Sequence, residues 1–210
     1  MFKKSRILLL ALAALVMASC GDMASKLGGM KTDSPDVLEK AKELVKANFD
    51  PAQWKVVSVD WSEGAGQDEL TGEVASVRFY MIDKDGKAWQ QSFHPSLGWK
   101  ASDLDDTSFA EGDKYDDPKE YPALELDKLD AAKYTKIIED AKALIPKGYT
   151  YKSMESFEMN TFDKSPMELV FNVVEEGKET VTNAGKTSTV YYQLRYSVSD
   201  DGKVKFEGAI

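Results

Sequence analysis

Cysteine and histidine occur once each among the 210 residues, and long hydrophobic runs are scarce. With Cys20 as the only thiol, the chain cannot close a disulfide on itself. A single histidine, His94, leaves too few ligands for a zinc site built from histidine and cysteine. The apolar run Ile7 to Met17 has 11 residues, whereas a membrane-spanning helix needs about 20. The sequence therefore excludes a disulfide scaffold, a zinc module of this type and a spanning helix in that run.

The N-terminus has the three parts of an export signal. Three of the first six residues are basic, the apolar run follows, and the small residues Ala18 and Ser19 come directly before Cys20. This order is typical of a secretory signal peptide with a small-residue cleavage site. We therefore expect residues 1–19 to be a signal peptide and Cys20 to be the first residue of the mature chain.

The stretch Val16-Met17-Ala18-Ser19-Cys20 resembles the lipobox of bacterial lipoproteins. The resemblance implies cleavage before Cys20 and attachment of several acyl chains to that residue. Two or more acyl chains anchor a protein stably to a membrane, whereas a single chain does not. Gly21 stands where such lipoproteins carry aspartate for inner-membrane retention, so the resemblance implies the outer membrane, facing the periplasm. An ordinary signal peptide followed by an incidental cysteine is the alternative.

The charge balance is acidic, with 36 Asp and Glu against 27 Lys and Arg and a net charge of −9. An acidic surface argues against nucleic acid or anionic lipid as a partner, so membrane contact is expected through the N-terminal lipid only. Residues 20–33 are polar and contain glycine, which indicates a lipidated cysteine followed by a flexible tether.

Residues 34–100 are expected to form a first α+β unit. Ser34 and Pro35 favour a helix start, and apolar residues at helical spacing continue to a stop before Asp50-Pro51. Alternating patterns predict strands over 54–61, 73–82 and 87–93, with the turn sequence DKDG closing a hairpin between the last two.

Residues 128–210 repeat this order, with a helix predicted over 128–145 and strands over 149–157, 167–175, 189–199 and 203–207. EKAKELV at 39–45 matches EDAKALI at 139–145, and DKDGKA at 83–88 matches SDDGKV at 199–204. We interpret the chain as α+β with two similar units, each an N-terminal helix packed on an antiparallel sheet of three to four strands. Chance similarity of common elements is the alternative.

An acidic linker, residues 101–127, separates the two units. The block 101–130 holds eleven Asp or Glu and three Lys, and such charge runs usually form a solvated segment. Calcium binding by Asp103, Asp105, Asp106 and Glu111 is the alternative, although Ser108 stands where an EF-hand loop needs glycine.

Candidate binding residues come from the tryptophans, all four of which precede residue 100. Trp54 and Trp61 lie an odd number of residues apart on a predicted strand, so they should point to opposite faces and leave at least one exposed. Trp61 and Trp89 are therefore the candidate ligand-binding residues, with core packing as the alternative. His94 is interpreted as a polar residue at a strand end.

The helix followed by IPKGYTYKSMESF at 145–157 and a hairpin resembles a PepSY-type module. Two such units in tandem, 34–95 and 128–207, resemble the PepSY-like, beta-lactamase-inhibitor-like proteins of the bacterial envelope, although the insertion around 159–187 departs from that unit. The resemblance implies a non-catalytic, protein-binding role.

The sequence thus predicts a lipid-anchored cell-envelope protein that is not an enzyme and has no cofactor, metal or catalytic residue. Its expected partner is an envelope protein or peptide. In the sharper form of this prediction, the protein is an inhibitor or immunity protein whose acidic segment meets a basic target. The alternative function is binding of a glycan, cell-wall fragment or small ligand, or a scaffold role, through exposed tryptophans.

Overall fold

The computed structural model describes residues 29–107, 120–162, 165–183 and 185–210. Within the chain, residues 31–210 form one compact unit. The expected signal peptide, the lipidation site Cys20 and the tether up to residue 28 lie outside the described residues. In the part that is described, no helix is long and apolar enough to cross a membrane.

Two helices and eleven strands make up the described unit. They are α1 (Pro35–Asn48), β1 (Trp54–Glu63), β2 (Val74–Asp83), β3 (Ala88–His94), β4 (Lys100–Ala101), β5 (Asp105–Asp106), α2 (Ala131–Ala143), β6 (Tyr149–Asn160), β7 (Met167–Glu175), β8 (Thr180–Asn183), β9 (Lys186–Thr189), β10 (Tyr192–Val198) and β11 (Val204–Ala209). Short 3-10 turns occupy Gly66–Asp68, Pro95–Leu97 and Leu126–Lys128.

The helix starts follow from side-chain caps. Ser34 Oγ accepts a hydrogen bond from the Asp36 backbone N–H at 3.2 Å, so α1 begins at Pro35 as the sequence predicts. The second helix begins at Ala131 rather than at Lys128, because Asp130 is its cap and accepts from the Lys133 N–H at 2.7 Å. The preceding Leu126–Lys128 form a separate 3-10 turn.

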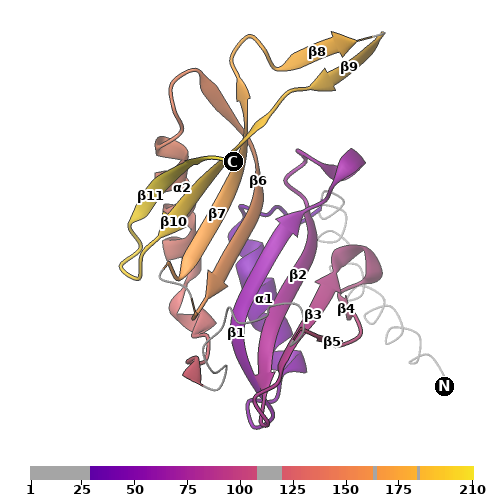
Figure 1. Ribbon diagram of the computed structural model, residues 1–210, viewed down its shortest axis with the longest axis vertical. Coiled ribbons are helices and arrows are strands. Elements are labelled where there is room, and N and C mark those ends of the chain that lie inside the picture. Colours follow the sequence, from indigo (N-terminus) through magenta and orange to yellow (C-terminus); the bar gives the residue numbers. More distant parts are fainter. Residues whose placement is uncertain (1–28, 108–119, 163–164, 184) are drawn as a thin grey trace, which may run out of the picture. The chain divides into compact units, whose positions relative to one another are not determined.

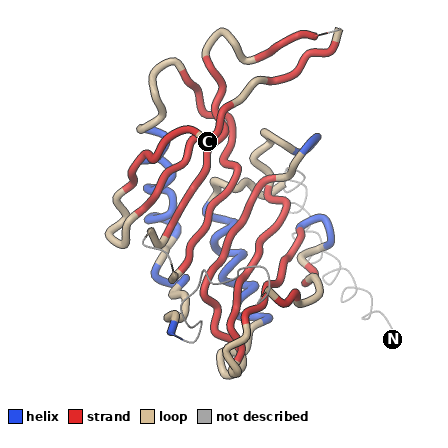
Figure 2. The backbone as a smooth tube through the Cα atoms, viewed as in Figure 1, coloured by secondary structure: helices blue, strands red, loops and turns tan. Residues whose placement is uncertain are grey.

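Nine strands of the described residues form one antiparallel sheet in the order β11-β10-β7-β6-β1-β2-β3-β4, with β5 also paired to β3. The two helices lie on one face of this sheet, behind it in the view of Figure 1. The opposite face carries no helix of the described residues. Strands β8 and β9 form a separate hairpin that extends beyond β7 and β10 (Figure 2).

The expectation of a separate small sheet for each unit is wrong, because β1 and β6 pair with each other. Strands β2 and β3 continue outward from β1, and β7, β10 and β11 continue outward from β6. Pairing the two first strands removes an exposed edge that each separate sheet would have had. The helices do not divide cleanly between the halves either, since Tyr134 of α2 contacts Trp61 of β1 with ring centroids 5.8 Å apart.

The hydrophobic core lies between the helices and the sheet. Phe49, at the end of α1, packs edge-on against Phe79 at 5.3 Å, and Phe157 stacks on Trp61 at 4.6 Å. Fully buried residues of this core come from both helices and from five strands. They include Val37, Leu38 and Ala41; Tyr134 and Ala141; Val59 and Trp61; Val77, Phe79 and Met81; Met154 and Phe157; Leu169, Phe171 and Val173; and Tyr196 and Val198.

The last residues of the expected tether belong to the folded unit. The Thr32 backbone N–H donates to Gly72 O at 2.8 Å, and the Thr32 carbonyl accepts from Trp61 Nε1 at 3.0 Å and from the Tyr134 hydroxyl at 2.6 Å. Thr32 itself is fully buried. The boundary predicted at residue 33 is therefore too late, because these hydrogen bonds fix the chain from Lys31 onward.

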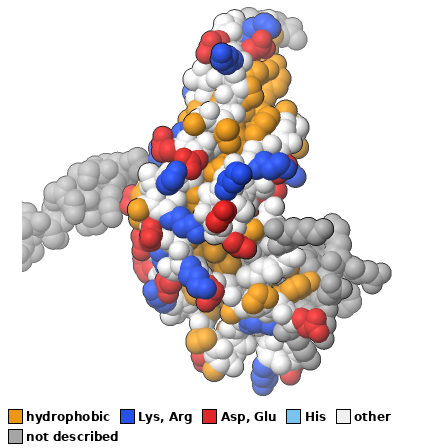
Figure 3. Space-filling model, turned by 90° about the vertical axis from the view of Figure 1, so that its left-hand side faces the viewer, with side chains coloured by type: hydrophobic (Ala, Val, Ile, Leu, Met, Phe, Trp, Pro, Cys, Tyr) orange, Lys and Arg blue, Asp and Glu red, His pale blue; other side chains and the backbone are white. Residues whose placement is uncertain are grey.

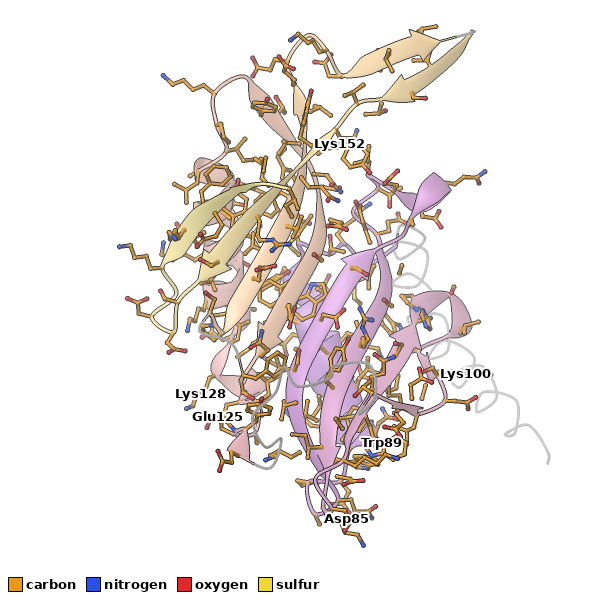
Figure 4. The ribbon with its side chains drawn as sticks, viewed as in Figure 1. Asp85, Trp89, Lys100, Glu125, Lys128 and Lys152 are labelled. Carbon is orange, nitrogen blue, oxygen red and sulfur yellow. The ribbon has the colours of Figure 1, made fainter. Side chains whose placement is uncertain are left out.

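The described flanks of the acidic linker also contact the sheet. Strands β4 and β5 pair with β3, and the Leu124 N–H donates to Val56 O at 2.8 Å. Three of its described acids are paired with lysines: Asp106 with Lys87 at 2.6 Å, Asp127 with Lys46 at 3.3 Å, and Glu125 with Lys128. Glu125 and Lys128 lie close together in Figure 4. Glu111 of the considered calcium site lies outside the described residues.

Candidate functional site

A groove of about 580 Å³ lies on the helix-free face of the sheet. Its floor is formed by side chains of β1, β2, β6 and β7 that alternate with the core residues of the same strands, so they point away from the helices. Among the described residues, four carboxyl groups and one guanidinium line it, together with several aromatic rings. The lining includes Asp60, Arg78, Tyr80, Trp89, Tyr121, Glu155, Glu158, Phe162 and Glu168.

A row of charged side chains crosses the floor of the groove on adjacent strands. Arg78 of β2 is paired in register with Asp60 of β1, Asp60 with Glu158 of β6, and Glu158 with Glu168 of β7. We call Asp60, Glu158 and Glu168 the carboxylate row. Like charges directly opposite each other on neighbouring strands destabilise a sheet, so this arrangement costs the fold stability.

Guanidinium groups on the neighbouring strands β2 and β10 offset part of that charge. Arg78 binds Asp60 with both ends of its fork, Nε to Oδ2 and Nη2 to Oδ1, each at 3.0 Å. Arg195 of β10 reaches Glu168 with a distance of 3.4 Å between Nε and Oε1. Glu158 Oε1 accepts a hydrogen bond from Nδ2 of the uncharged Asn160 side chain at 3.2 Å.

Burial dominates the electrostatics of the Asp60–Arg78 pair. The side chain of Asp60 is only 14% exposed, and burial raises the pKa of its carboxyl even though Arg78 opposes that shift. The hydrogen bond to Asp60 raises the pKa of Arg78 in turn. A carboxylate held this way is oriented by its partner and exposes little of its own charge to the groove.

Glu155 lies at an irregularity of β6, where the pairing with β7 shifts register between Met154 and Ser156. Such bulges re-aim side chains, and they are frequent beside functional sites. Burial raises the pKa of the Glu155 carboxyl, and the negative charge of nearby Glu63 raises it further. In the described residues neither Glu155 nor Glu63 forms an ion pair with a lysine or arginine.

Aromatic rings form the walls of the groove. Tyr121 and Phe162 contact each other with ring centroids 5.8 Å apart, and both come from segments that flank the sheet. Tyr80 stands beside the charged row, with the Arg78 guanidinium 5.7 Å from its ring centroid. The site thus combines flat apolar surfaces with an excess of carboxylates.

Trp61 is not a surface residue, and its proposed role in ligand binding is wrong. It has 0% exposure and packs between Tyr134 and Phe157. The argument from odd spacing fails because β1 shifts register against β2 between Val56 and Ser58, so the simple alternation from Trp54 to Trp61 is broken.

Trp89 is half-buried and lines one end of the groove, near the β2–β3 turn that Asp85 marks in Figure 4. Its indole N–H donates to Asp83 Oδ2 at 2.9 Å, the Lys87 ammonium lies 4.4 Å from its ring centroid, and Trp54 packs edge-on at 6.4 Å. These contacts already hold much of the ring, so Trp89 contributes a wall rather than an open stacking platform.

The remaining sequence candidates lie elsewhere. His94 Nδ1 is 3.1 Å from the Ala75 carbonyl, which fits the predicted polar residue at a strand end. Among the described residues no group of three or more His, Cys, Asp or Glu side chains is arranged to hold a metal ion.

Sequence reasoning missed the charged row, although Asp60, Arg78 and Glu168 lie within predicted strands and Glu158 comes directly after the predicted strand 149–157. A charged residue among apolar ones marks the solvent face of a strand. Their meeting depends on the β1–β6 pairing, which no local pattern specifies. The surface toward β10 and β11 looks different, because basic and acidic side chains are interspersed there (Figure 3).

Comparison of the chain with protein-family models, with curated proteins and with solved structures gives no match. The resemblances to a lipoprotein signal and to PepSY-like proteins therefore stay predictions, and the site is interpreted from its own geometry.

Proposed function

We propose that this protein is a lipid-anchored component of the bacterial cell envelope that binds another protein or a peptide without catalysing a reaction. The observation that carries the proposal is the groove on the helix-free sheet face, about 580 Å³ in volume and lined by both aromatic and charged side chains. Aromatic surface rimmed by polar groups is typical of protein-binding sites.

The anchor is proposed at Cys20, with residues 1–19 removed. Because hydrogen bonds tie the chain into the fold from Lys31 onward, ten residues from Gly21 to Met30 would link the lipid to the domain. At about 5–6 Å times the square root of the residue number, they span roughly 15–20 Å. Cys20→Ser is expected to move the protein from the membrane fraction to the soluble periplasmic fraction, and retention in the membrane would contradict lipid attachment there.

Two similar units fused through β1 and β6 remain our interpretation of the chain's origin. The meanders β1-β2-β3 and β6-β7-β10 both run outward from the centre and each follows a helix. In this interpretation the groove lies over the junction of the two halves, where neither half alone could form it.

The binding role is tested by cross-linking affinity-tagged, full-length protein in cells and identifying what is recovered by mass spectrometry. One protein recovered in near-stoichiometric amount supports the proposal and identifies the partner. Reproducible recovery of wall fragments, or recovery of no protein above a control lipoprotein, contradicts it.

A glycan or cell-wall ligand bound through tryptophan is the second candidate, and it depends on Trp89. The burial of Trp61 removes one of its two candidate residues, while Trp89 still lines the groove. A change of tryptophan fluorescence with oligosaccharides, lost in Trp89→Phe, would favour this function.

A further inference from the structure

The connection between β1 and β2 meets the sheet at one end of the groove. On β6 the groove lining runs from Glu155 to Glu158, whereas Ser153, two residues before it, is only 2% exposed. A methyl group at Gly72 of the connection would lie 3.6 Å from Ser153 Cβ, so the backbone of the connection packs directly against β6. The groove therefore ends where the connection contacts this strand.

One buried carboxylate holds the connection to the sheet. Glu63, at the end of β1, is 7% exposed, and it accepts hydrogen bonds from the Gly72 N–H at 2.7 Å and from the Leu70 N–H at 3.3 Å. The same carboxylate accepts from Ser153 Oγ at 3.0 Å and from Asn172 Nδ2 at 2.5 Å. These four hydrogen bonds join the connection to β6 and β7.

We call residues 64–70 the strap. Its second attachment is Glu69, which accepts a hydrogen bond from the hydroxyl of Tyr191, the residue directly before β10. Gly64 and Gly72 flank the strap, and the chain is fixed beyond it, because the Gly72 carbonyl accepts from the Thr32 N–H at 2.8 Å. The strap is thus a short segment between two glycines that is attached to the sheet at two points.

The closed strap carries costs that its opening would relieve. Leu70 has a φ of 61°, in the left-handed region that bulky residues rarely adopt. Oδ1 of the fully buried Asn172 has no hydrogen-bond partner among the described residues, and the buried charge of Glu63 is held by four uncharged donors. Burying such groups away from water is unfavourable. In an open strap, water would hydrate both groups and Leu70 would be free to leave the left-handed region.

We propose that the strap opens when a partner binds, so that Glu63 and Asn172 become accessible at the end of the groove. The inference rests on the proposed function and concerns how the partner occupies the same groove. Asn172 lies four residues beyond Glu168, which lines the groove on β7, so the groove would gain roughly 13 Å along this strand. The amide and the carboxylate can then form hydrogen bonds with the backbone of an extended segment of the partner.

Amide hydrogen exchange, followed by NMR on full-length protein in detergent, tests whether the strap opens separately from the rest of the fold. The Leu70 N–H is expected to exchange at least about 100-fold faster than the N–H groups of β7, since opening leaves the sheet intact. Equal protection of Leu70 and β7 would show that only global unfolding releases the strap, and it would overturn the proposal.

Two variants should move the opening in opposite directions. Tyr191→Phe removes the hydrogen bond to Glu69 and should speed exchange at Leu70 at least about threefold. Leu70→Gly should slow exchange at this position, because glycine adopts a φ of 61° without steric cost. Tyr192→Phe, at the neighbouring exposed ring, is the matched control, and an equal effect there would contradict the attachment through Tyr191. Exchange in β7 is recorded for each variant, because global destabilisation would speed exchange there as well.

Capture of the partner in cells tests whether the opening matters for binding. A photo-reactive benzoylphenylalanine in place of Ser156, which lines the groove, should capture the partner at least about twofold better in Tyr191→Phe and less well in Leu70→Gly. Capture that neither variant changes would contradict the role of the strap and leave protein binding intact. Absence of capture in every variant would instead contradict the proposed function.

Discussion

Asp60 and Glu158 lie directly opposite each other in the antiparallel pairing of β1 and β6, at the centre of the sheet. Glu158 faces a second acid, Glu168, on its other side. Cross-strand pairs of like charge destabilise a sheet. The acidic side chains on this face therefore oppose the pairing of β1 with β6. The stacked pair Trp61–Phe157 on the helix face supplies packing that compensates.

The difference in stability between wild type and a Glu155→Gln variant should depend on pH. Burial and Glu63 raise the folded-state pKa of Glu155 above its ordinary value of 4.5, so ionisation lowers the stability as pH rises through the folded-state pKa. Glu155→Gln should then be more stable than wild type at pH 7, and the difference should vanish below about pH 4.5. A difference that is constant between pH 3.5 and 7 would show that titration of Glu155 is not its cause.

Trp61 is buried and Trp89 is partly exposed, so replacing each by alanine should lower the free energy of unfolding by different amounts. Trp61→Ala should lower the free energy of unfolding by about 3–5 kcal/mol, because it leaves a cavity beside Tyr134 and Phe157. Trp89→Ala loses the hydrogen bond to Asp83 and a smaller buried area, so its cost should be clearly lower. Equal costs would contradict the assignment of Trp61 to the core.

The hydroxyl of Tyr134 helps to attach the N-terminal segment to the fold, so its removal should lower the stability. Tyr134→Phe removes the 2.6 Å hydrogen bond to the Thr32 carbonyl, while Trp61 still donates to that oxygen. We expect a loss of about 0.5–1.5 kcal/mol in unfolding free energy and faster protease cleavage near residue 31. Tyr192→Phe, at an exposed ring, is the control, and an equal effect there would contradict a specific attachment.

The elements that local patterns specify were predicted well. The first helix, the Asp-Gly turn between β2 and β3, and strand β7 at Met167–Glu175 all follow the sequence expectations. Each depends on caps, turn residues or alternation within a few positions. The predicted strand 189–199 is instead divided between β9 and β10, because the chain leaves the β8–β9 hairpin before it joins the sheet.

Local sequence patterns could not predict which distant strands pair with each other. The β1–β6 pairing joins residues about one hundred positions apart, and it decides both the single sheet and the charged row. Bulges inside β1 and β6 break the alternation from which face assignments are made. That is why Trp61 was assigned to a surface role and why Asp60, Glu158 and Glu168 were missed as a group.

Site-specific photo-cross-linking in cells tests the binding groove most directly. The photo-reactive residue benzoylphenylalanine would replace Tyr80, which lines the groove. The matched control has it in place of Tyr192 of β10, which is exposed and is not part of the groove lining. We predict that the Tyr80 position captures one envelope protein in high yield and that the Tyr192 position does not. Equal yields at both positions, or capture from Tyr192 alone, would contradict the claim that this groove is the binding site.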